Sequence, residues 1–242
     1  MLENKEGQNI PETSFKIQKD GQWKEIHTND IFKGRNVVVF SLPGAFTPTC
    51  SSTHLPRYNE LANIFKQEGI DEIVCISVND TFVMNEWLEN QEAENITVIP
   101  DGNGDFTEAM GMLVDKSAIG FGKRSWRYSM LVRDQKIEKM FIEPQKEGDP
   151  FEVSDADTML KYINPNAKLP SFATLFTKKG CPHCTRAKDL LKAKGIIYEE
   201  IELNNKLTRR SMLNVTGGNT TPQIYLDGKY IGTADNLEKA LS

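Results

Sequence analysis

The stretch Val37-Val38-Val39-Phe40-Ser41-Leu42-Pro43-Gly44-Ala45-Phe46-Thr47-Pro48-Thr49-Cys50-Ser51 decides how the first two thirds of this chain fold. Its first four residues form a continuous apolar run, which predicts a strand covered on both faces. After the Pro-Gly loop, apolar residues recur at helical spacing, at Leu55, Tyr58, Leu61, Ala62 and Phe65. The stretch therefore predicts a strand, a loop and a helix, with Cys50 in the first turn of that helix.

Patterns on both sides of this stretch predict an α/β domain. We expect one hairpin over residues 14–27, turning at Asp20-Gly21, and another over residues 127–142, turning at Asp134-Gln135. Between them lie, in order, an apolar strand at 73–78, an acidic helical stretch around 82–88 and a strand at 96–99. Strands that alternate with helices are typical of a sheet with crossover connections.

A polar segment then divides the chain. Asn164-Pro165-Asn166-Ala167-Lys168-Leu169-Pro170-Ser171 has the proline and asparagine content of a linker. The pattern restarts after it on a smaller scale: a strand at 172–176, a helix at 184–194, a strand at 196–201, a helix at 209–215, a hairpin at 223–231 about Asp227-Gly228, and a helix from Asp235. We therefore predict two α/β domains, 1–165 and 170–242, each a central mixed sheet flanked by helices.

The composition excludes several classes of protein. With 38% hydrophobic and 26% charged residues, the chain is typical of a soluble globular protein. No apolar run approaches the about 18 residues of a membrane span, so we expect no membrane association. The first residues, Met1-Leu2-Glu3-Asn4-Lys5-Glu6-Gly7, are polar and acidic, unlike a secretory signal. A cytoplasmic protein is expected.

Charge is divided unevenly between the two predicted domains. Residues 1–165 carry 17 Lys and Arg against 27 Asp and Glu, a net charge of −10, and residues 166–242 carry 12 against 7, a net charge of +5. A basic segment often binds nucleic acid, but this one carries regular strands and helices and few clustered charges. We expect no nucleic-acid partner, and two domains of opposite sign that attract each other.

Two of the four cysteines lie in the first domain, in different settings. Cys50 is expected at a helix N-terminus, where unpaired N–H groups favour the thiolate. A buried, inert cysteine explains this position equally well on composition alone. Cys75 lies mid-strand among Ile73, Val74, Ile76 and Val78, which indicates a packing residue with an ordinary or raised pKa.

The other two cysteines form Cys181-Pro182-His183-Cys184, directly after the strand at 172–176. A Cys-x-x-Cys at a strand-to-helix turn is typical of a redox dithiol, and nearby Lys178, Lys179 and Arg186 favour its thiolate. Structural zinc is the alternative. It needs two further ligands, and the chain has neither a second Cys-x-x-Cys nor a His-x-x-x-His among its three histidines. We expect no metal.

The segment around Cys50 resembles the active-site signature of peroxiredoxins, Pro-x-x-x-Thr/Ser-x-x-Cys, in the form typical of the peroxiredoxin-5 subfamily. The resemblance covers most of residues 5–163, including Val74-Cys75-Ile76-Ser77-Val78-Asn79-Asp80 and Arg127-Tyr128-Ser129-Met130. It implies a thioredoxin-like fold in which Cys50 is the peroxidatic nucleophile and becomes a sulfenic acid.

The same resemblance implies roles for three further residues. Thr47 would hydrogen-bond the peroxide, Pro43 would shield the site, and Arg127 would stabilise the thiolate and orient the oxygens. Only the local Arg-Tyr-Ser-Met match selects Arg127 over Lys123 and Arg124. His54 lies one helical turn after Cys50. It is interpreted as a residue that packs, or that supports the reacting groups from behind, and not as the base.

Residues 170–242 resemble a glutaredoxin. Cys-Pro-His-Cys occupies the position of the family's Cys-Pro-Tyr-Cys. Thr221-Pro222 resembles the family's Val-Pro, which has a cis proline, and Gly232–Leu237 resembles its Gly-Gly-x-Asp-x-Leu. The second Gly of that last motif is Thr233 here, and the Val is Thr221. The resemblance implies that glutathione lies along Lys178, Thr221, Pro222 and the helix start at Asp235 and Asn236, with Arg209 as a further candidate.

Together the two resemblances imply a hybrid of a peroxiredoxin and a glutaredoxin: a thiol peroxidase that reduces hydrogen peroxide and small alkyl hydroperoxides, with glutathione as reducing co-substrate and no bound cofactor. Cys181 and Cys184 would supply the redox disulfide, and a homo-oligomer, dimer or tetramer, is expected. Two other functions stay open: a general protein disulfide or mixed-disulfide reductase, and a redox-regulated binding module.

Overall fold

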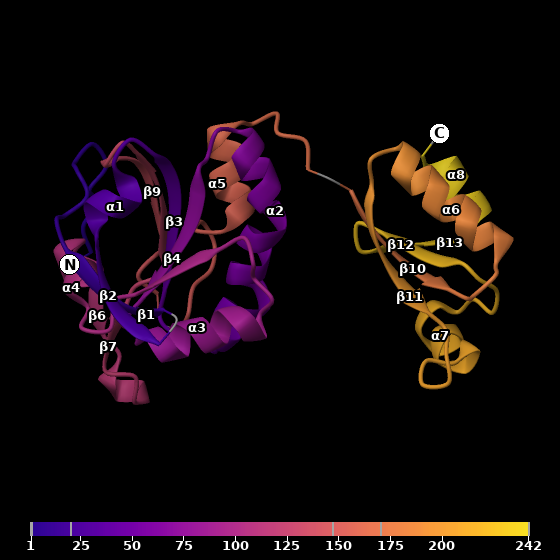
Figure 1. The fold of residues 1–242 in the computed structure, drawn as a ribbon, viewed down its shortest axis with the longest axis horizontal. Helices are drawn as coiled ribbons and strands as arrows, with labels where there is room; N and C mark the ends of the chain where they lie inside the picture. Colours follow the sequence, from indigo (N-terminus) through magenta and orange to yellow (C-terminus); the bar gives the residue numbers. More distant parts are fainter. Residues whose placement is uncertain (1, 20, 147, 170, 242) are drawn as a thin grey trace. The chain divides into compact units, whose positions relative to one another are not determined.

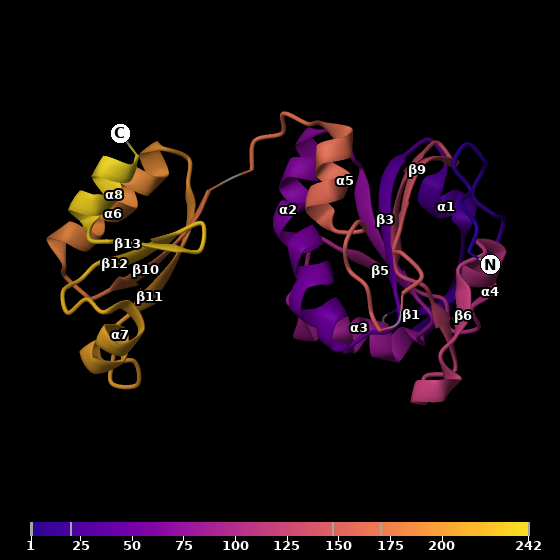
Figure 2. The ribbon, with the colours of Figure 1, turned by 180° about the vertical axis from the view of Figure 1, so that it is seen from behind.

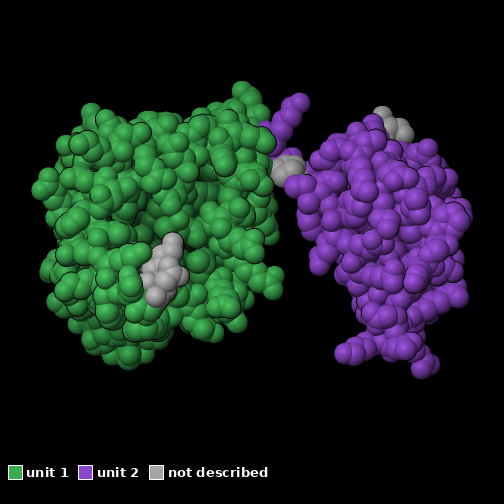
Figure 3. Space-filling model, viewed as in Figure 1, with its two compact units in different colours: residues 1–167 green, residues 168–242 purple. Residues whose placement is uncertain are grey.

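The computed structural model describes residues 2–19, 21–146, 148–169 and 171–241. The chain divides into two compact units, Met1–Ala167 and Lys168–Ser242 (Figure 3). Each unit has its own sheet and its own buried core, so each is described by itself. Asp20 of the expected first turn and Pro170 of the expected linker lie outside the described residues.

The first unit is built on a five-stranded mixed sheet in the order β5-β4-β3-β8-β9. β3 (Asn36–Leu42), β4 (Glu72–Ser77) and β5 (Thr97–Pro100) are parallel, whereas β8 (Tyr128–Arg133) and β9 (Lys136–Ile142) run antiparallel to their neighbours. Two smaller two-stranded sheets pair β1 (Ser14–Lys19) with β2 (Gln22–His27) and β6 (Leu113–Asp115) with β7 (Lys123–Ser125).

Alternation along β3 explains why both faces of this sheet are covered. Val38 and Phe40 enter one apolar core, and Val37 and Val39 enter the other, because successive side chains of a strand point to opposite faces. Helices α2 (Leu55–Gln67), α3 (Thr81–Asn90) and α5 (Ala156–Ile163) pack on the first face (Figure 2). The second face is covered by β1 with α1 (Thr28–Phe32) and α4 (Asp105–Ala109) (Figure 1).

The second unit has a four-stranded mixed sheet in the order β11-β10-β12-β13. Its strands are β10 (Phe172–Thr177), parallel to β11 (Ile197–Glu202), and β12 (Gln223–Leu226), antiparallel to β10 and to β13 (Lys229–Gly232). Helices α6 (Pro182–Ala193) and α8 (Ala234–Ala240) lie together on one face, and α7 (Arg209–Thr216) lies across the sheet from them (Figures 1 and 2).

The predicted fold class is confirmed: both units are central mixed sheets flanked by helices. The exact limits of the two domains, 1–165 and 170–242, stay a prediction. No helix among the described residues is long and apolar enough to cross a membrane. One feature of the helix after Cys50 differs from a regular α-helix, because its first turn, Cys50–His54, is a wide π-helical turn that continues into α2.

Candidate active site

Cys50 lies at the carboxyl end of β3, where the chain leaves the sheet and starts a helix. Ser51 N–H donates to Thr47 O at 3.0 Å, so the helical hydrogen bonds already begin at Thr47. The thiol is fully buried, and it opens the π-helical turn. Single π-turns of this kind are frequent at functional sites. The expectation that Cys50 lies in the first helical turn is met.

Two donors from different parts of the chain reach the Cys50 sulfur. The Thr47 hydroxyl lies 2.8 Å from Sγ, and Arg127 Nη1 donates to Sγ at 3.5 Å. Helix geometry explains the first contact, because residues three apart lie on one face. Sheet pairing explains the second: Ser41 of β3 faces Tyr128 of β8, which puts Arg127 beside the loop that leads to Cys50. Both donors suit a thiolate.

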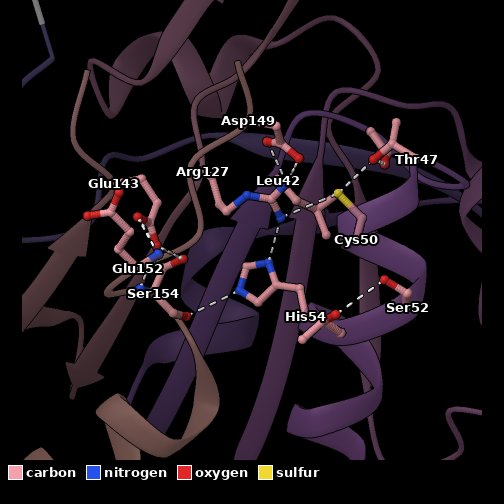
Figure 4. Close-up of polar contacts among 12 residues, drawn as sticks. Leu42, Thr47, Cys50, Ser52, His54, Arg127, Glu143, Asp149, Glu152 and Ser154 are labelled. Carbon is pink, nitrogen blue, oxygen red and sulfur yellow. Dashed lines mark hydrogen bonds and ion pairs between the residues drawn. The ribbon is translucent and has the colours of Figure 1, made fainter. Parts of the chain in front are cut away.

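Arg127 is itself held by two side chains that the sequence patterns did not connect with it (Figure 4). Nη1 lies 3.1 Å from His54 Nδ1, and Nη2 donates to both carboxylate oxygens of Asp149 at 2.6 Å. The Arg127 side chain is 1% exposed and that of Asp149 is 40% exposed. The guanidinium is therefore fixed from below by a buried imidazole and from outside by a half-exposed carboxylate.

His54 is a neutral member of this cluster. Complete burial, with the positive charge of Arg127 in second place, lowers the pKa of His54 to about 3. Arg127 has only hydrogen-bond donors, so Nδ1 must accept, and Nε2–H then donates to Ser154 O at 3.2 Å. Such a histidine does not act as the base for Cys50. Its interpretation as a residue behind the reacting groups agrees with this geometry.

The loop that carries Asp149 is anchored by a buried carboxylate. Glu143, 1% exposed, accepts the backbone N–H groups of Glu152, Val153 and Ser154 at 2.8 to 2.9 Å, together with the Ser154 hydroxyl at 2.8 Å. Buried carboxylates are costly unless they are hydrogen-bonded in this way. Glu143 thereby ties the residues just after Asp149 back to the end of β9; the described residues 143–146 and 148–154 are called the Glu143 strap, and its Asp149 reaches Arg127 (Figure 4).

The loop before Cys50 is held from a neighbouring strand. Asn79 Oδ1, just after β4, accepts the N–H of Ala45 at 3.1 Å and the Ser77 hydroxyl at 2.8 Å. Pro43 is buried in the same loop. Arg124 turns elsewhere, because its guanidinium donates to the backbone oxygens of Phe121 and Val78. Of the basic residues near 127, the structure brings Arg127 to the sulfur.

Cys75 lies below the site in β4, paired with Phe40 of β3 and Val98 of β5. It is fully buried, and burial raises the pKa of its thiol well above the ordinary value. A thiol of this kind is a poor nucleophile at neutral pH. The geometry agrees with a packing residue.

The second unit carries Cys181 and Cys184 as a disulfide at the start of α6, with their Cα atoms 5.2 Å apart. Cys181 is the N-cap of this helix, and the N–H of Cys184 donates to its sulfur at 3.2 Å. The Thr221 hydroxyl lies 3.5 Å from the same sulfur, next to the cis peptide bond between Thr221 and Pro222. The cis bond expected there is present, and both donors suit a thiolate at Cys181.

The other expected glutathione contacts are spread around this dithiol. Lys178 is exposed just after β10. At the start of α8, Asp235 pairs with Arg186 of α6, and the Asn236 side-chain oxygen accepts from the Thr233 N–H and hydroxyl at 3.1 and 2.7 Å. Arg209 donates to Asn219 O in the loop before the cis bond. Binding of a ligand by these residues stays a prediction.

Sequence patterns missed the partners of Arg127. Asp149 is 22 residues and His54 is 73 residues from Arg127, so no local spacing signals either contact. Within the ranges that the structure describes, no group of three or more His, Cys, Asp or Glu is arranged to hold a metal ion.

Comparison with known families matches both units. The redoxin family model matches residues 5–160, and the glutaredoxin family model matches residues 173–231. The chain is similar over nearly its whole length to the hybrid peroxiredoxin hyPrx5 of Haemophilus influenzae, with 56% identity over 98% of this chain and 99% of the relative. It is also 60% identical to peroxiredoxin sll1621 of Synechocystis, over 59% of this chain and 77% of the relative.

Solved structures are similar to the first unit. Reduced Prx3 of Vibrio vulnificus, in complex with H2O2, matches with a TM-score of 0.62 and 39% identity, over 65% of this chain and 98% of that protein. Peroxiredoxin 5 of Alvinella pompejana matches with a TM-score of 0.59 and 33% identity, over 68% of this chain and all of that protein.

Proposed function

The chain belongs to the redoxin family as a hybrid peroxiredoxin, a thioredoxin-like peroxiredoxin unit followed by a glutaredoxin unit, and from this premise we propose that its thiol peroxidase activity is driven by glutathione. Hydrogen peroxide and small alkyl hydroperoxides are the proposed substrates. The observation that carries the proposal is the presence, in one chain, of a buried cysteine between two donors and a Cys-x-x-Cys dithiol at a helix N-terminus.

In the oxidative half of the cycle, the Cys50 thiolate attacks the terminal oxygen of the hydroperoxide. The O–O bond breaks, its electron pair leaves with the other oxygen, and that oxygen takes a proton to become water or an alcohol. Sulfur is oxidised to the sulfenic acid. In this proposal Thr47 and Arg127, the two donors at Sγ, stabilise the thiolate and the charge that develops on the leaving oxygen, and Pro43 shields the site.

In the reductive half, glutathione condenses with the sulfenic acid, releasing water and leaving a mixed disulfide on Cys50. The Cys181 thiolate then attacks the glutathione sulfur, and Cys50 leaves as a thiolate. Attack by Cys184 on the new mixed disulfide releases glutathione and forms the Cys181–Cys184 disulfide, the state present in the structure. Further glutathione reduces it, because glutaredoxin potentials of about −200 to −230 mV lie near the cytosolic glutathione poise.

Linking the two units has a kinetic advantage. A short tether raises the effective concentration of the reductant to about the millimolar range. We propose that the glutathione sites lie at Lys178, Thr221, Pro222, Asp235 and Asn236, in a cytoplasmic protein that assembles as a dimer or tetramer. Size-exclusion chromatography with light scattering tests the assembly, and a monomer at micromolar concentration would contradict it.

The experiment that tests the proposed function follows peroxide consumption by the full chain with glutathione, and separately with dithiothreitol. Cys50→Ser should abolish turnover with both reductants. Cys181→Ser should abolish turnover with glutathione and keep turnover with dithiothreitol. Cys75→Ser serves as the matched control, since it makes the same change at a buried cysteine of the same unit. Full glutathione-driven turnover by Cys181→Ser would refute the proposed route of electrons.

A further inference from the structure

We propose that Asp149 is a specificity-determining residue of the peroxide site, which selects uncharged hydroperoxides against those that carry a negative charge near the peroxide group. The inference rests on the proposed peroxidase function and goes beyond it, because it makes a residue outside the Cys50 motif responsible for selecting substrates by their charge. Its basis is the way in which the hydrogen-bond donors of Arg127 are already used.

The terminal nitrogens of Arg127 carry four N–H bonds. Nη1 contacts Cys50 Sγ and His54 Nδ1, and Nη2 contacts both oxygens of Asp149. The remaining donor, Nε, is buried on the stem of the side chain, away from the sulfur, without a hydrogen-bond partner in the part of the chain that the structure describes (Figure 4). A peroxide oxygen that is to bind a terminal nitrogen therefore competes with the three present partners.

Burial decides which partner gives way. Cys50 and His54 are completely buried, whereas the Asp149 side chain is 40% exposed. Water solvates the Asp149 carboxylate when it moves off Nη2, and it would not reach His54 in the same way. The carboxylate and the incoming peroxide oxygen are thus competitors for Nη2. The Glu143 strap limits how far Asp149 withdraws, because it fixes residues 152–154 only three positions further along the chain.

A carboxylate that stays close has a consequence for charged substrates. Asp149 balances the positive charge of Arg127, and the Cys50 thiolate adds one negative charge to the cluster. A hydroperoxide that carries its own anion therefore meets an unfavourable net charge, whereas a neutral hydroperoxide meets none. Like charges repel strongly at the low effective dielectric of a partly buried site.

The test uses two probes that differ in one charge: 4-hydroperoxy-4-methylpentanoic acid, anionic at pH 7, and its neutral methyl ester. Oxidation of Cys50 is measured by stopped-flow fluorescence in the full chain with Cys181→Ser and Cys184→Ser, which leaves out the reductive half. Trp87, whose Nε1 donates to Ser51 Oγ beside Cys50, is the natural reporter. The rate ratio of ester to acid is the readout, because a loss of packing slows both probes alike.

Asp149→Asn keeps the size of the side chain and removes its charge. We expect the ester-to-acid ratio to fall about tenfold, the order of one like-charge repulsion at a half-exposed site. Asp149→Glu, which keeps the charge, should restore most of the ratio. Glu152→Gln is the matched control: it removes one charge from the same strap, where Glu152 pairs with Lys146 and not with Arg127, and should change the ratio less than twofold.

The outcomes separate the two proposals. A reactive ester with the same ratio in Asp149→Asn as in the parent chain, or an equal fall in Glu152→Gln, would overturn the role of Asp149 and leave the peroxidase intact. An ester that does not oxidise Cys50 in the parent chain would overturn the role of Asp149, and a parent chain that hydrogen peroxide does not oxidise either would overturn the peroxidase as well.

Discussion

Of the two donors at the Cys50 sulfur, the Thr47 hydroxyl makes the shorter contact, at 2.8 Å against 3.5 Å for Arg127 Nη1. The substitution Thr47→Val tests the contribution of this hydroxyl. Valine replaces the hydroxyl by a methyl group of similar size, so the packing of this half-buried residue changes little. A hydrogen bond to a charged group contributes about 1.5 to 3 kcal/mol. Each 1.36 kcal/mol is tenfold in rate, so Cys50 oxidation should slow by about 10- to 150-fold.

The assay is stopped-flow oxidation of the reduced full chain by hydrogen peroxide at pH 7, with the peroxide in excess. Thr47→Ser keeps the hydroxyl and should stay within about threefold of the parent rate, because the hydrogen bond survives. Thr49→Val makes the same chemical change two residues away and controls for helix stability. A Thr47→Val rate within twofold of the parent would refute the assignment of the hydroxyl to the sulfur and favour its alternative contact with Gly44 O at 3.0 Å.

Three further predictions concern the buried cysteine, the buried histidine and the charge division. Cys75→Ala should lower the free energy of unfolding by about 1 kcal/mol and leave turnover near normal; an obligatory Cys50–Cys75 disulfide after one peroxide pulse, detected by mass spectrometry, would contradict this. His54 has its pKa lowered to about 3, from 6.5 in the unfolded chain, so the unfolded state binds the extra proton and stability is lost as pH falls below 6.5. The free energy of urea unfolding, followed by tryptophan fluorescence, should increase with pH between pH 5 and 6. Its slope should exceed the slope of His54→Gln by about 1 kcal/mol per pH unit, and equal slopes would argue against a neutral buried imidazole. Reduction of oxidised Cys50 by a separate protein of residues 168–242 should slow as the salt concentration rises, because the first segment has a net charge of −10 and the second of +5. Salt screens their attraction, since the Debye length shrinks from about 10 Å at 0.1 M to about 3 Å at 1 M. If the rate with dithiothreitol depends equally on salt, electrostatic docking of the two segments is refuted.

Tryptophan fluorescence suits the histidine experiment for a structural reason. Trp23, Trp87 and Trp126 are the chain's three tryptophans, and all lie in the first unit. The signal therefore reports unfolding of the unit that contains His54, separately from that of the second unit.

Features that depend on neighbours along the chain could be predicted from the residue pattern alone. The apolar run at 37–40 and the helical spacing from Leu55 to Phe65 specified β3 and α2, because periodicity follows from which faces are buried. Thr47 and Cys50 are three residues apart in a helical turn, and Cys181 and Cys184 are three residues apart at the start of α6. Local backbone geometry is enough to bring each pair together, so both pairs could be predicted before any tertiary contact was known, whereas the role of Cys50 followed from the resemblance to peroxiredoxins.

The surroundings of the Cys50 sulfur, by contrast, form only when distant parts of the first unit pack together. Pairing of β8 with β3 selects Arg127 and leaves Arg124 on the backbone oxygens of Phe121 and Val78, a difference that residue type alone does not contain. The partners of the guanidinium, His54 and Asp149, approach it across 73 and 22 residues of chain. Contacts of that length depend on sheet register and on loop closure, which arise only when the whole unit packs, and sequence spacing carries no record of them.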